Sequence, residues 1–234
     1  MKVLHVVNIS FVIPYFFGDQ FKFMKDNDVE SFVACSENEN LKKYSIDYGF
    51  TKLEIPIRRK ISFFQDLKSI FILIYYIRKY KIDIIVGHTP KGGLLASVAA
   101  TLSQTKCIYV RHGLNFETQT GFSLLIMKTV ETVCSRLSKL TINVSKSVLE
   151  KSLRENLVLK KNQILLNEGS FNGVDSELKF NPNSYSIKKS NEIITYGFIG
   201  RLSKDKGFEL LINSWKQLIQ IHNNIKLIIA DCLA

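Results

Sequence analysis

The residues best suited to chemistry form a short cationic segment in the last fifth of the chain. Gly200-Arg201 follows an apolar run, and Lys206-Gly207 comes shortly after it, at the start of a helical pattern. Arginine offers a rigid fork that matches phosphate oxygens, lysine offers a mobile point charge, and a helix N-terminus exposes amide donors. The two glycines permit close approach of the backbone. The spacing therefore predicts a diphosphate-binding site, although neither the P-loop pattern nor the dinucleotide-binding fingerprint is present.

A second candidate segment follows a strand-like run that ends at Val86. His88 and Lys91 supply a polar group and a charge, and Gly92-Gly93 is predicted to open a helix whose amides are exposed to an anion. A glycine pair at a helix start is equally explained by close packing. The segment is therefore a candidate site with a structural alternative.

A third candidate segment, Arg111-His112-Gly113, follows the run that ends at Val110. Ligands of open α/β sheets bind at the carboxyl ends of strands, so we expect Arg111 and His112 to lie in a cleft. Histidine can act as acid, base or hydrogen-bond donor near neutral pH. A lone histidine is as readily explained by a structural role.

Positioning these segments requires a sheet whose strands end beside them. Continuous apolar runs, typical of parallel strands buried on both faces, alternate with longer helical patterns. We expect strands at 3–7, 31–35, 53–57, 82–86, 107–110, 140–144 and 163–166. We expect helices at 14–27, 41–48, 65–80, 92–102, 123–138 and 145–155. The alternation predicts an α/β fold built on a doubly wound sheet with right-handed crossovers.

The composition changes between residues 167 and 191, where Asn, Ser, Gly and Pro dominate. A strand at 192–199, a helix at 206–222 and a strand at 225–230 are predicted after it. We therefore expect a complete first domain at 1–170, a linker at 171–191, and at 192–234 only the first βαβ unit of a second domain.

Composition and charge limit the classes of function. The chain has 234 residues, of which 46% are hydrophobic and 23% charged, which is typical of a globular protein. Its net charge of +11 attracts polyanions such as nucleic acids, anionic membranes or phosphorylated substrates. No nucleic-acid-binding motif accompanies the charge, which disfavours nucleic acid. The apolar run at 70–77 is too short to span a bilayer. The cysteines are scattered, which favours a reducing cytosolic compartment and disfavours a zinc site.

Five segments occur in a characteristic order and at characteristic separations. They are 55–58 followed by 66–67, then 88–93, 111–117, 169–175, and 200–201 with 206–207. Together they resemble the retaining glycosyltransferases of family 4, which adopt the GT-B fold of two Rossmann-like domains. The similarity is greatest to members that act in the synthesis of bacterial capsule, O-antigen and related surface glycans.

The resemblance implies a nucleotide-sugar donor held mainly by the second domain and an acceptor held mainly by the first. Gly200, Arg201 and Lys206 match residues that grip the donor diphosphate and stabilise the departing nucleotide. Two cations already offset that charge, so no metal and no other cofactor is expected. His112 matches the first-domain histidine near the reacting sugar and is expected to be catalytic.

The resemblance also implies an acceptor-side surface and a cellular location. Acceptors in this subgroup are commonly linked to a polyprenyl diphosphate, which fits a basic cytoplasmic protein in peripheral contact with the inner face of an anionic membrane. The residues expected on the acceptor side are His88, Lys91, Gly92, Gly93, Arg111 and Asn172.

The second domain departs from the family pattern. Family members carry two glutamates, eight positions apart, that bind the donor sugar and ribose, and no such pair occurs in this sequence. We expect a chain truncated within its second domain that transfers sugar weakly or not at all by itself. The alternative is a non-catalytic half of a split glycosyltransferase, which binds acceptor or membrane while a separate polypeptide supplies the donor domain.

Overall fold

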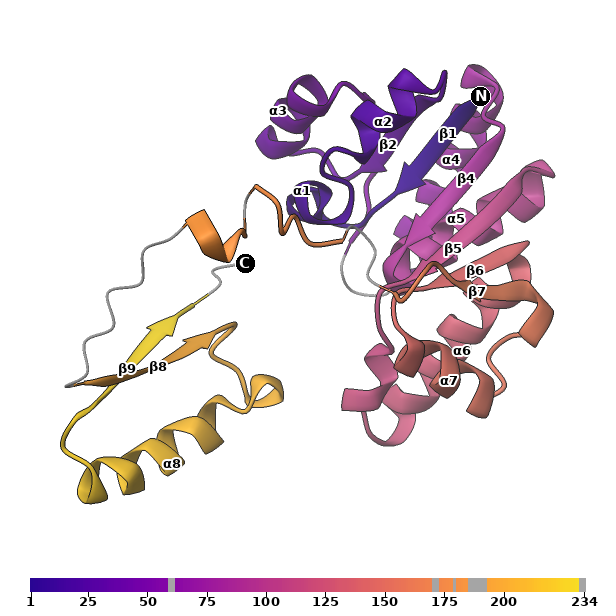
Figure 1. The fold of residues 1–234 in the computed structure, drawn as a ribbon. Coiled ribbons are helices and arrows are strands. Elements are labelled where there is room, and N and C mark those ends of the chain that lie inside the picture. The colour runs from indigo at the N-terminus through magenta and orange to yellow at the C-terminus, as the bar shows by residue number, and fades with distance from the viewer. Residues whose placement is uncertain (59–61, 170–172, 179, 185–192, 232–234) are drawn as a thin grey trace. The chain divides into compact units, whose positions relative to one another are not determined.

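The computed structural model describes residues 1–58, 62–169, 173–178, 180–184 and 193–231. The chain forms two compact units, Met1–Gly173 and Val174–Ala234 (Figure 1). Both units alternate strands and helices, and every strand pair is parallel. The predicted α/β fold is therefore confirmed.

The first unit is built on a seven-stranded parallel sheet in the order β3-β2-β1-β4-β5-β6-β7. The strand order reverses direction between β1 and β4, and in such sheets a crevice forms at this point, beyond the carboxyl ends of the strands. The strands are β1 (Lys2–Val6), β2 (Glu30–Cys35), β3 (Thr51–Glu54), β4 (Ile84–His88), β5 (Lys106–Arg111), β6 (Leu140–Asn143) and β7 (Gln163–Leu165).

Helices cover both faces of this sheet (Figure 1). One core packs Leu4 and Ile85 against Leu73 and Leu95, beneath α4 and α5, and a second core lies on the opposite face beneath α1, α2 and α3. The helices of the first unit are α1 (Ile13–Phe16), α2 (Gln20–Asp26), α3 (Glu39–Tyr48), α4 (Phe63–Tyr80), α5 (Thr89–Ser103), α6 (Gly121–Leu137) and α7 (Lys146–Arg154). Among the described residues, none of the helices combines the length and apolar character needed to cross a membrane.

Two predicted elements differ from the structure. The helix predicted at 14–27 is two helices, α1 and α2, because Gly18 takes a left-handed backbone with φ of 47° between them. The strand predicted at 53–57 is β3, which begins earlier and ends at Glu54. Ile55 and Ile57 are nevertheless buried in the core, so the apolar pattern reported their burial rather than strand pairing.

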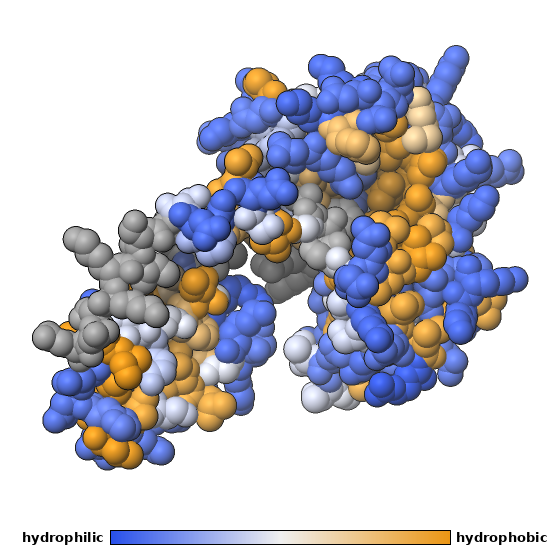
Figure 2. Space-filling view, in the orientation of Figure 1, coloured by the Kyte–Doolittle hydropathy of each residue, from blue (hydrophilic) through white to orange (hydrophobic). Residues whose placement is uncertain are grey.

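The second unit contains β8 (Ile194–Ile199), α8 (Phe208–Ile221) and β9 (Ile225–Ala230), with β8 and β9 paired in parallel. None of its described residues is buried. Large apolar side chains lie on its surface instead, among them Ile194 (62% exposed), Ile199 (82%) and Leu210 (71%), as the orange areas of Figure 2 indicate. This unit therefore has no enclosed core of its own.

Candidate functional site

The loop after β4 is tighter than the sequence pattern predicts. Helix α5 begins at Thr89, directly after His88, with Pro90 in its first turn. Thr89 takes φ of 65°, a left-handed conformation that is strained for a β-branched residue. Such strain clusters at functional sites, where the surrounding structure enforces it.

Gly92 and Gly93 lie inside α5, and both are buried. A Cβ on Gly92 would lie 2.7 Å from the carbonyl oxygen of Val6, and a Cβ on Gly93 would collide with the ring of Tyr109. The prediction that these glycines open the helix and expose amides to an anion is therefore wrong. They allow α5 to pack directly on β1 and β5.

Arg111 is the last residue of β5, and its side chain is fully buried. The prediction that it lies in an open cleft is also wrong, because the strand continues one residue further than its apolar run. Its Nε donates to Glu131 Oε2 at 3.0 Å, and its Nη1 donates to Asn143 Oδ1 at 2.9 Å and to Ser152 Oγ at 2.6 Å. Its Nη2 donates to Ser135. Arg111 therefore ties β5 to β6, α6 and α7.

Glu131 shares this interior with Arg111. Burial raises the pKa of the Glu131 carboxyl, while the Arg111 charge and hydrogen bonds from Arg111 and Tyr109 act in the opposite direction. The Tyr109 hydroxyl donates to the same carboxylate at 3.0 Å. These contacts satisfy the buried charge internally.

Three histidines lie on one face of the sheet, at the ends of three neighbouring strands. The register pairs His5 with Val86 and His88 with Val110, and residues two apart on a strand share a face. His5 Nδ1 lies 3.2 Å from His88 Nε2, and His88 Nδ1 lies 3.2 Å from His112 Nε2. We call these three residues the histidine chain.

Aromatic rings enclose the histidine chain. Phe16 stacks on His112 with ring centroids 3.8 Å apart, and Phe17 packs edge-on against His5 at 4.8 Å and His88 at 4.9 Å. Burial lowers the pKa of His5 to about 3 and that of His112 to about 4. Burial, with the neighbouring histidines, also holds the pKa of His88 well below its usual range. The three rings of the histidine chain are therefore neutral at pH 7.

A pocket of about 310 Å³ opens beyond the ends of β1, β4 and β5, at the point where the strand order reverses. Asn8 follows β1, Thr89 and Lys91 begin α5, and Asn115 follows β5, so the segments just beyond the three strands all reach it. Lys91 Nζ lies 2.5 Å from Asp66 Oδ2 on α4, which places a compensated charge at the pocket. The other lining residues are Ile9, Phe11, Val12, Pro90, Leu94, Met127 and Val130.

In the second unit the cationic segment follows β8 as predicted from the sequence. Gly200 takes φ of 152° directly after the strand, a backbone conformation that favours glycine. Arg201 Nη2 donates to Asp205 Oδ2 at 3.0 Å, in a pair that is largely exposed. Lys206 ends a single 3-10 turn, Lys204–Lys206, that precedes α8. Both cations are accessible to solvent.

Some residues of the site were not predicted from the sequence, and one predicted residue lies outside the part of the chain that the structure describes. His5 and Asn8 were not singled out, because the strands predicted at 3–7 and 82–86 do not give the register that brings His5 to His88. Thr89 gave no signal, because its strain follows from the tight turn into α5. Asn172 lies outside the described residues.

Known glycosyltransferases are similar to this chain in sequence. Residues 2–144 match the family described as glycosyl transferase 4-like. The capsular polysaccharide biosynthesis glycosyltransferase CapM of Staphylococcus aureus is 31% identical, over 99% of this chain and 61% of its own length. The UDP-Gal:alpha-D-GlcNAc-diphosphoundecaprenol alpha-1,3-galactosyltransferase of Escherichia coli is 26% identical, over 91% of this chain and 57% of its own length.

The crystal structure of Anabaena Alr3699/HepE in complex with UDP and glucose superposes with a TM-score of 0.67, at 14% identity, over 100% of this chain and 62% of that one. This likeness concerns the fold alone. The chain spans about three fifths of the length of the two relatives above.

Proposed function

Because the chain belongs to the glycosyl transferase 4-like family, we propose that it acts in the transfer of a sugar from a nucleotide-diphosphate sugar to a glycan acceptor in the synthesis of a bacterial surface polysaccharide. The observation that carries the proposal is the similarity, along nearly the whole chain, to a glycosyltransferase of capsule synthesis. The two candidate sites suit the two substrates of such a reaction.

The donor diphosphate is assigned to the segment after β8. Gly200 has no side chain to obstruct a phosphate, and Arg201 and Lys206 supply two accessible cations. The Arg201–Asp205 pair is exposed, and exposed pairs are worth little, so a diphosphate can replace Asp205 at small cost. The two cations would offset the charge that develops on the departing nucleotide, and we propose that this role requires no metal.

The acceptor is assigned to the pocket of the first unit. Its apolar lining, from Ile9 to Val130, is interrupted by four polar residues, Asn8, Thr89, Lys91 and Asn115. This combination suits a sugar hydroxyl presented next to a lipid carrier. The E. coli relative acts on a diphosphoundecaprenol-linked sugar, which supports a lipid-linked acceptor here.

Contact with the membrane is assigned to the outer face of α4. Phe64 (84% exposed), Phe71 (61%) and Tyr75 (55%) lie on this face, and exposed Lys68 and Lys79 accompany them. Aromatic and basic side chains on one helical face favour peripheral binding to anionic lipid. We propose a cytoplasmic protein at the inner face of the membrane, whose binding to phosphatidylglycerol vesicles falls in Phe71→Asp and persists in the matched surface variant Ile46→Asp on α3.

A transfer assay tests the proposed function. Radiolabelled UDP-hexoses are incubated with the chain and with membranes that contain diphosphoundecaprenol-linked sugars, and label in the lipid fraction is counted. Arg201→Ala and Lys206→Ala are each expected to weaken donor use by about 1.5–3 kcal/mol, the range for a charge-assisted hydrogen bond. Lys204→Ala, on the same 3-10 turn, is the control. Equal effects of the Lys204 and Lys206 changes would refute the assignment.

A second function is favoured by the surface of the second unit. Its apolar side chains have no enclosed core, so a separate donor-domain polypeptide could cover them, and the chain would then be the acceptor- or membrane-binding half of a split enzyme. Adding candidate partner polypeptides to the same assay separates the two. Transfer by the chain alone at an ordinary enzymatic rate would exclude the split enzyme.

A further inference from the structure

The histidine chain begins at a nitrogen that has no partner. His5 Nε2 is buried, and among the described residues it forms no hydrogen bond. A buried nitrogen that carries an unpaired proton costs more than a buried lone pair, and unpaired buried N–H groups are rare in proteins. This asymmetry decides which way the hydrogen bonds of the chain run.

Only two placements of the protons keep all three rings neutral and both hydrogen bonds of the histidine chain intact. In the first, His5 Nδ1 donates to His88 Nε2, and His88 Nδ1 donates to His112 Nε2. In the second, both bonds run in the opposite direction, which forces the proton of His5 onto its unpartnered Nε2. A proton added to any ring of the intact chain has the same consequence, because it leaves His5 Nε2 protonated.

We propose that His5 and His88 are positioning residues that fix His112 as its neutral Nδ1–H tautomer. The lone pair of His112 Nε2 is then occupied by the proton of His88, and the ring presents its own proton at Nδ1. Stacking on Phe16 holds the ring plane, and the low pKa of each histidine agrees with a chain that stays neutral.

This assignment deepens the proposed function and rests on it for its consequence. His112 would act toward a sugar oxygen as a hydrogen-bond donor through Nδ1. It would not act as a base through Nε2, because accepting a proton there reverses both bonds and leaves an unpaired proton on His5.

Nitrogen NMR tests the tautomers without any sugar transfer. The chain has four histidines, and the exposed His222 supplies an in-molecule reference. In long-range proton–nitrogen spectra of the ¹⁵N-histidine-labelled chain at pH 7, the three chain histidines are expected to carry protons on Nδ1 and bare Nε2 atoms. Loss of one signal set in His112→Gln assigns that residue. An Nε2–H tautomer or an imidazolium at His112 would overturn the proposal.

Two changes at position 88 separate positioning from packing. His88→Asp replaces the donor with an acceptor, so His112 is expected to carry a proton on Nε2, which the carboxylate accepts. His88→Asn retains an amide donor near the place of Nδ1 and is expected to keep His112 in its Nδ1–H form. A His112 Nε2 that stays bare in His88→Asp would show that position 88 does not set the tautomer. If His88→Asp fails to fold, the spectrum of the unsubstituted protein still decides.

In the transfer assay the same logic predicts a distinct order of activities. His112→Asn, whose amide nitrogen overlays Nδ1, is expected to retain at least about tenfold more kcat than His112→Gln, whose amide overlays Nε2, as for one hydrogen bond of about 1.4 kcal/mol. The reverse order would contradict donation through Nδ1. A chain that transfers no sugar would refute the proposed function and leave the tautomer test intact.

Discussion

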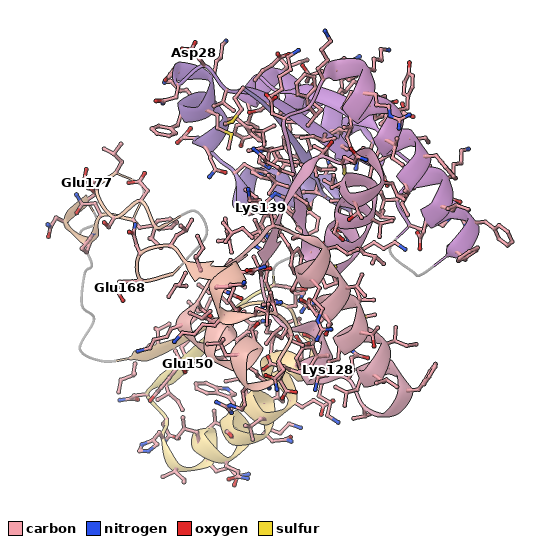
Figure 3. The ribbon with its side chains drawn as sticks, turned by 90° about the vertical axis from the view of Figure 1, so that its right-hand side faces the viewer. Asp28, Lys128, Lys139, Glu150, Glu168 and Glu177 are labelled. Atoms are coloured by element: carbon pink, nitrogen blue, oxygen red, sulfur yellow. The ribbon has the colours of Figure 1, made fainter. Side chains whose placement is uncertain are left out.

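Arg111 and Glu131 form an ion pair that is exposed by 0% and 1%. Besides the bond within the pair, four neighbouring side chains form hydrogen bonds with it, namely Tyr109, Ser135, Asn143 and Ser152. Its burial is tolerated because each hydrogen-bonding atom of the two charged groups has a partner. The surface pair of Lys128 and Glu155, whose lysine is labelled on α6 in Figure 3, differs because water screens both charges. The two pairs therefore predict very different responses to mutation.

Arg111→Met is expected to lower the free energy of unfolding by about 3–5 kcal/mol, because it leaves Glu131 buried without a cation. The double variant Arg111→Met/Glu131→Gln removes the charge and is expected to recover more than half of the loss. Lys128→Ala, the surface control, should cost at most about 1 kcal/mol. Urea unfolding measures all three. A double variant as unstable as the single one would contradict the explanation that the loss comes from an unpaired buried charge on Glu131.

The histidine chain predicts how stability depends on pH. The pKa values of His5, about 3, and His112, about 4, lie below the ordinary value near 6.5, so the unfolded chain binds protons more readily. Their contribution is fully present above pH 6.5 and is lost as the pH falls toward the folded values. Between pH 7 and pH 5 each histidine is expected to cost about 2 kcal/mol.

The comparison of His5→Phe with the unsubstituted chain isolates one histidine. The aromatic ring keeps the packing against Phe17, and the loss of stability between pH 7 and pH 5 should shrink by about 2 kcal/mol. His222→Gln, in an exposed position, is the control. Identical pH slopes for His5→Phe and the unsubstituted chain would show that His5 does not contribute.

At the scale of elements, α5 is the part that brings the site together. It starts at the strained Thr89, packs through Gly92 and Gly93, and ends at Gln104, which also takes a left-handed backbone with φ of 58°. Its two ends therefore carry the same conformation, one beside the pocket and one away from it. This symmetry supplies a matched pair of substitutions.

Thr89→Gly and Gln104→Gly are both expected to stabilise the chain by about 1 kcal/mol, because glycine adopts a left-handed backbone without strain. Only Thr89→Gly removes a side chain from the pocket lining, so only this change should raise the KM for the acceptor. Urea unfolding and the transfer assay measure the two effects. A destabilised Thr89→Gly, or an acceptor KM raised equally by both, would contradict the account.

The elements also show which features of the protein follow from sequence patterns. Strand positions were predicted well, because continuous apolar runs report burial on both faces of a parallel sheet. The burial of Arg111 was not predictable, because its partners Glu131 and Ser152 are distant in sequence and lie on two helices. The break at Gly18 depends on a backbone angle that a helical apolar pattern does not reveal.

At the scale of the whole molecule, the two units differ in how much of their apolar surface is buried. The first unit encloses two cores on opposite faces of seven strands, whereas the described part of the second unit has one strand pair, one long helix and no buried residue. A two-stranded sheet is marginally stable in water without a covering layer. Local unfolding should therefore be concentrated in the second unit.

Hydrogen exchange of the intact chain is expected to show this difference. Amides of β8 and β9 should exchange at least about 100-fold faster than those of β1, β4 and β5, since local opening ranges from almost no cost to the full free energy of unfolding. Mass spectrometry of peptic peptides measures both sets in one sample. Equal protection of β8 and β4 would mean that the second unit is stabilised by something other than its own packing.

The strand order has a consequence for biosynthesis. The ribosome releases β1 first, yet β1 is an inner strand, and its neighbour β4 begins only at Ile84. Until then a nascent chain can assemble β3, β2 and β1, while the other edge of β1 waits unpaired. Likewise, His5 has no histidine partner until His88 has been synthesised, and the contact of His88 with His112 forms later still. The growing polypeptide therefore completes the histidine chain from His5 outward, and His112 is the last of its three rings to be synthesised.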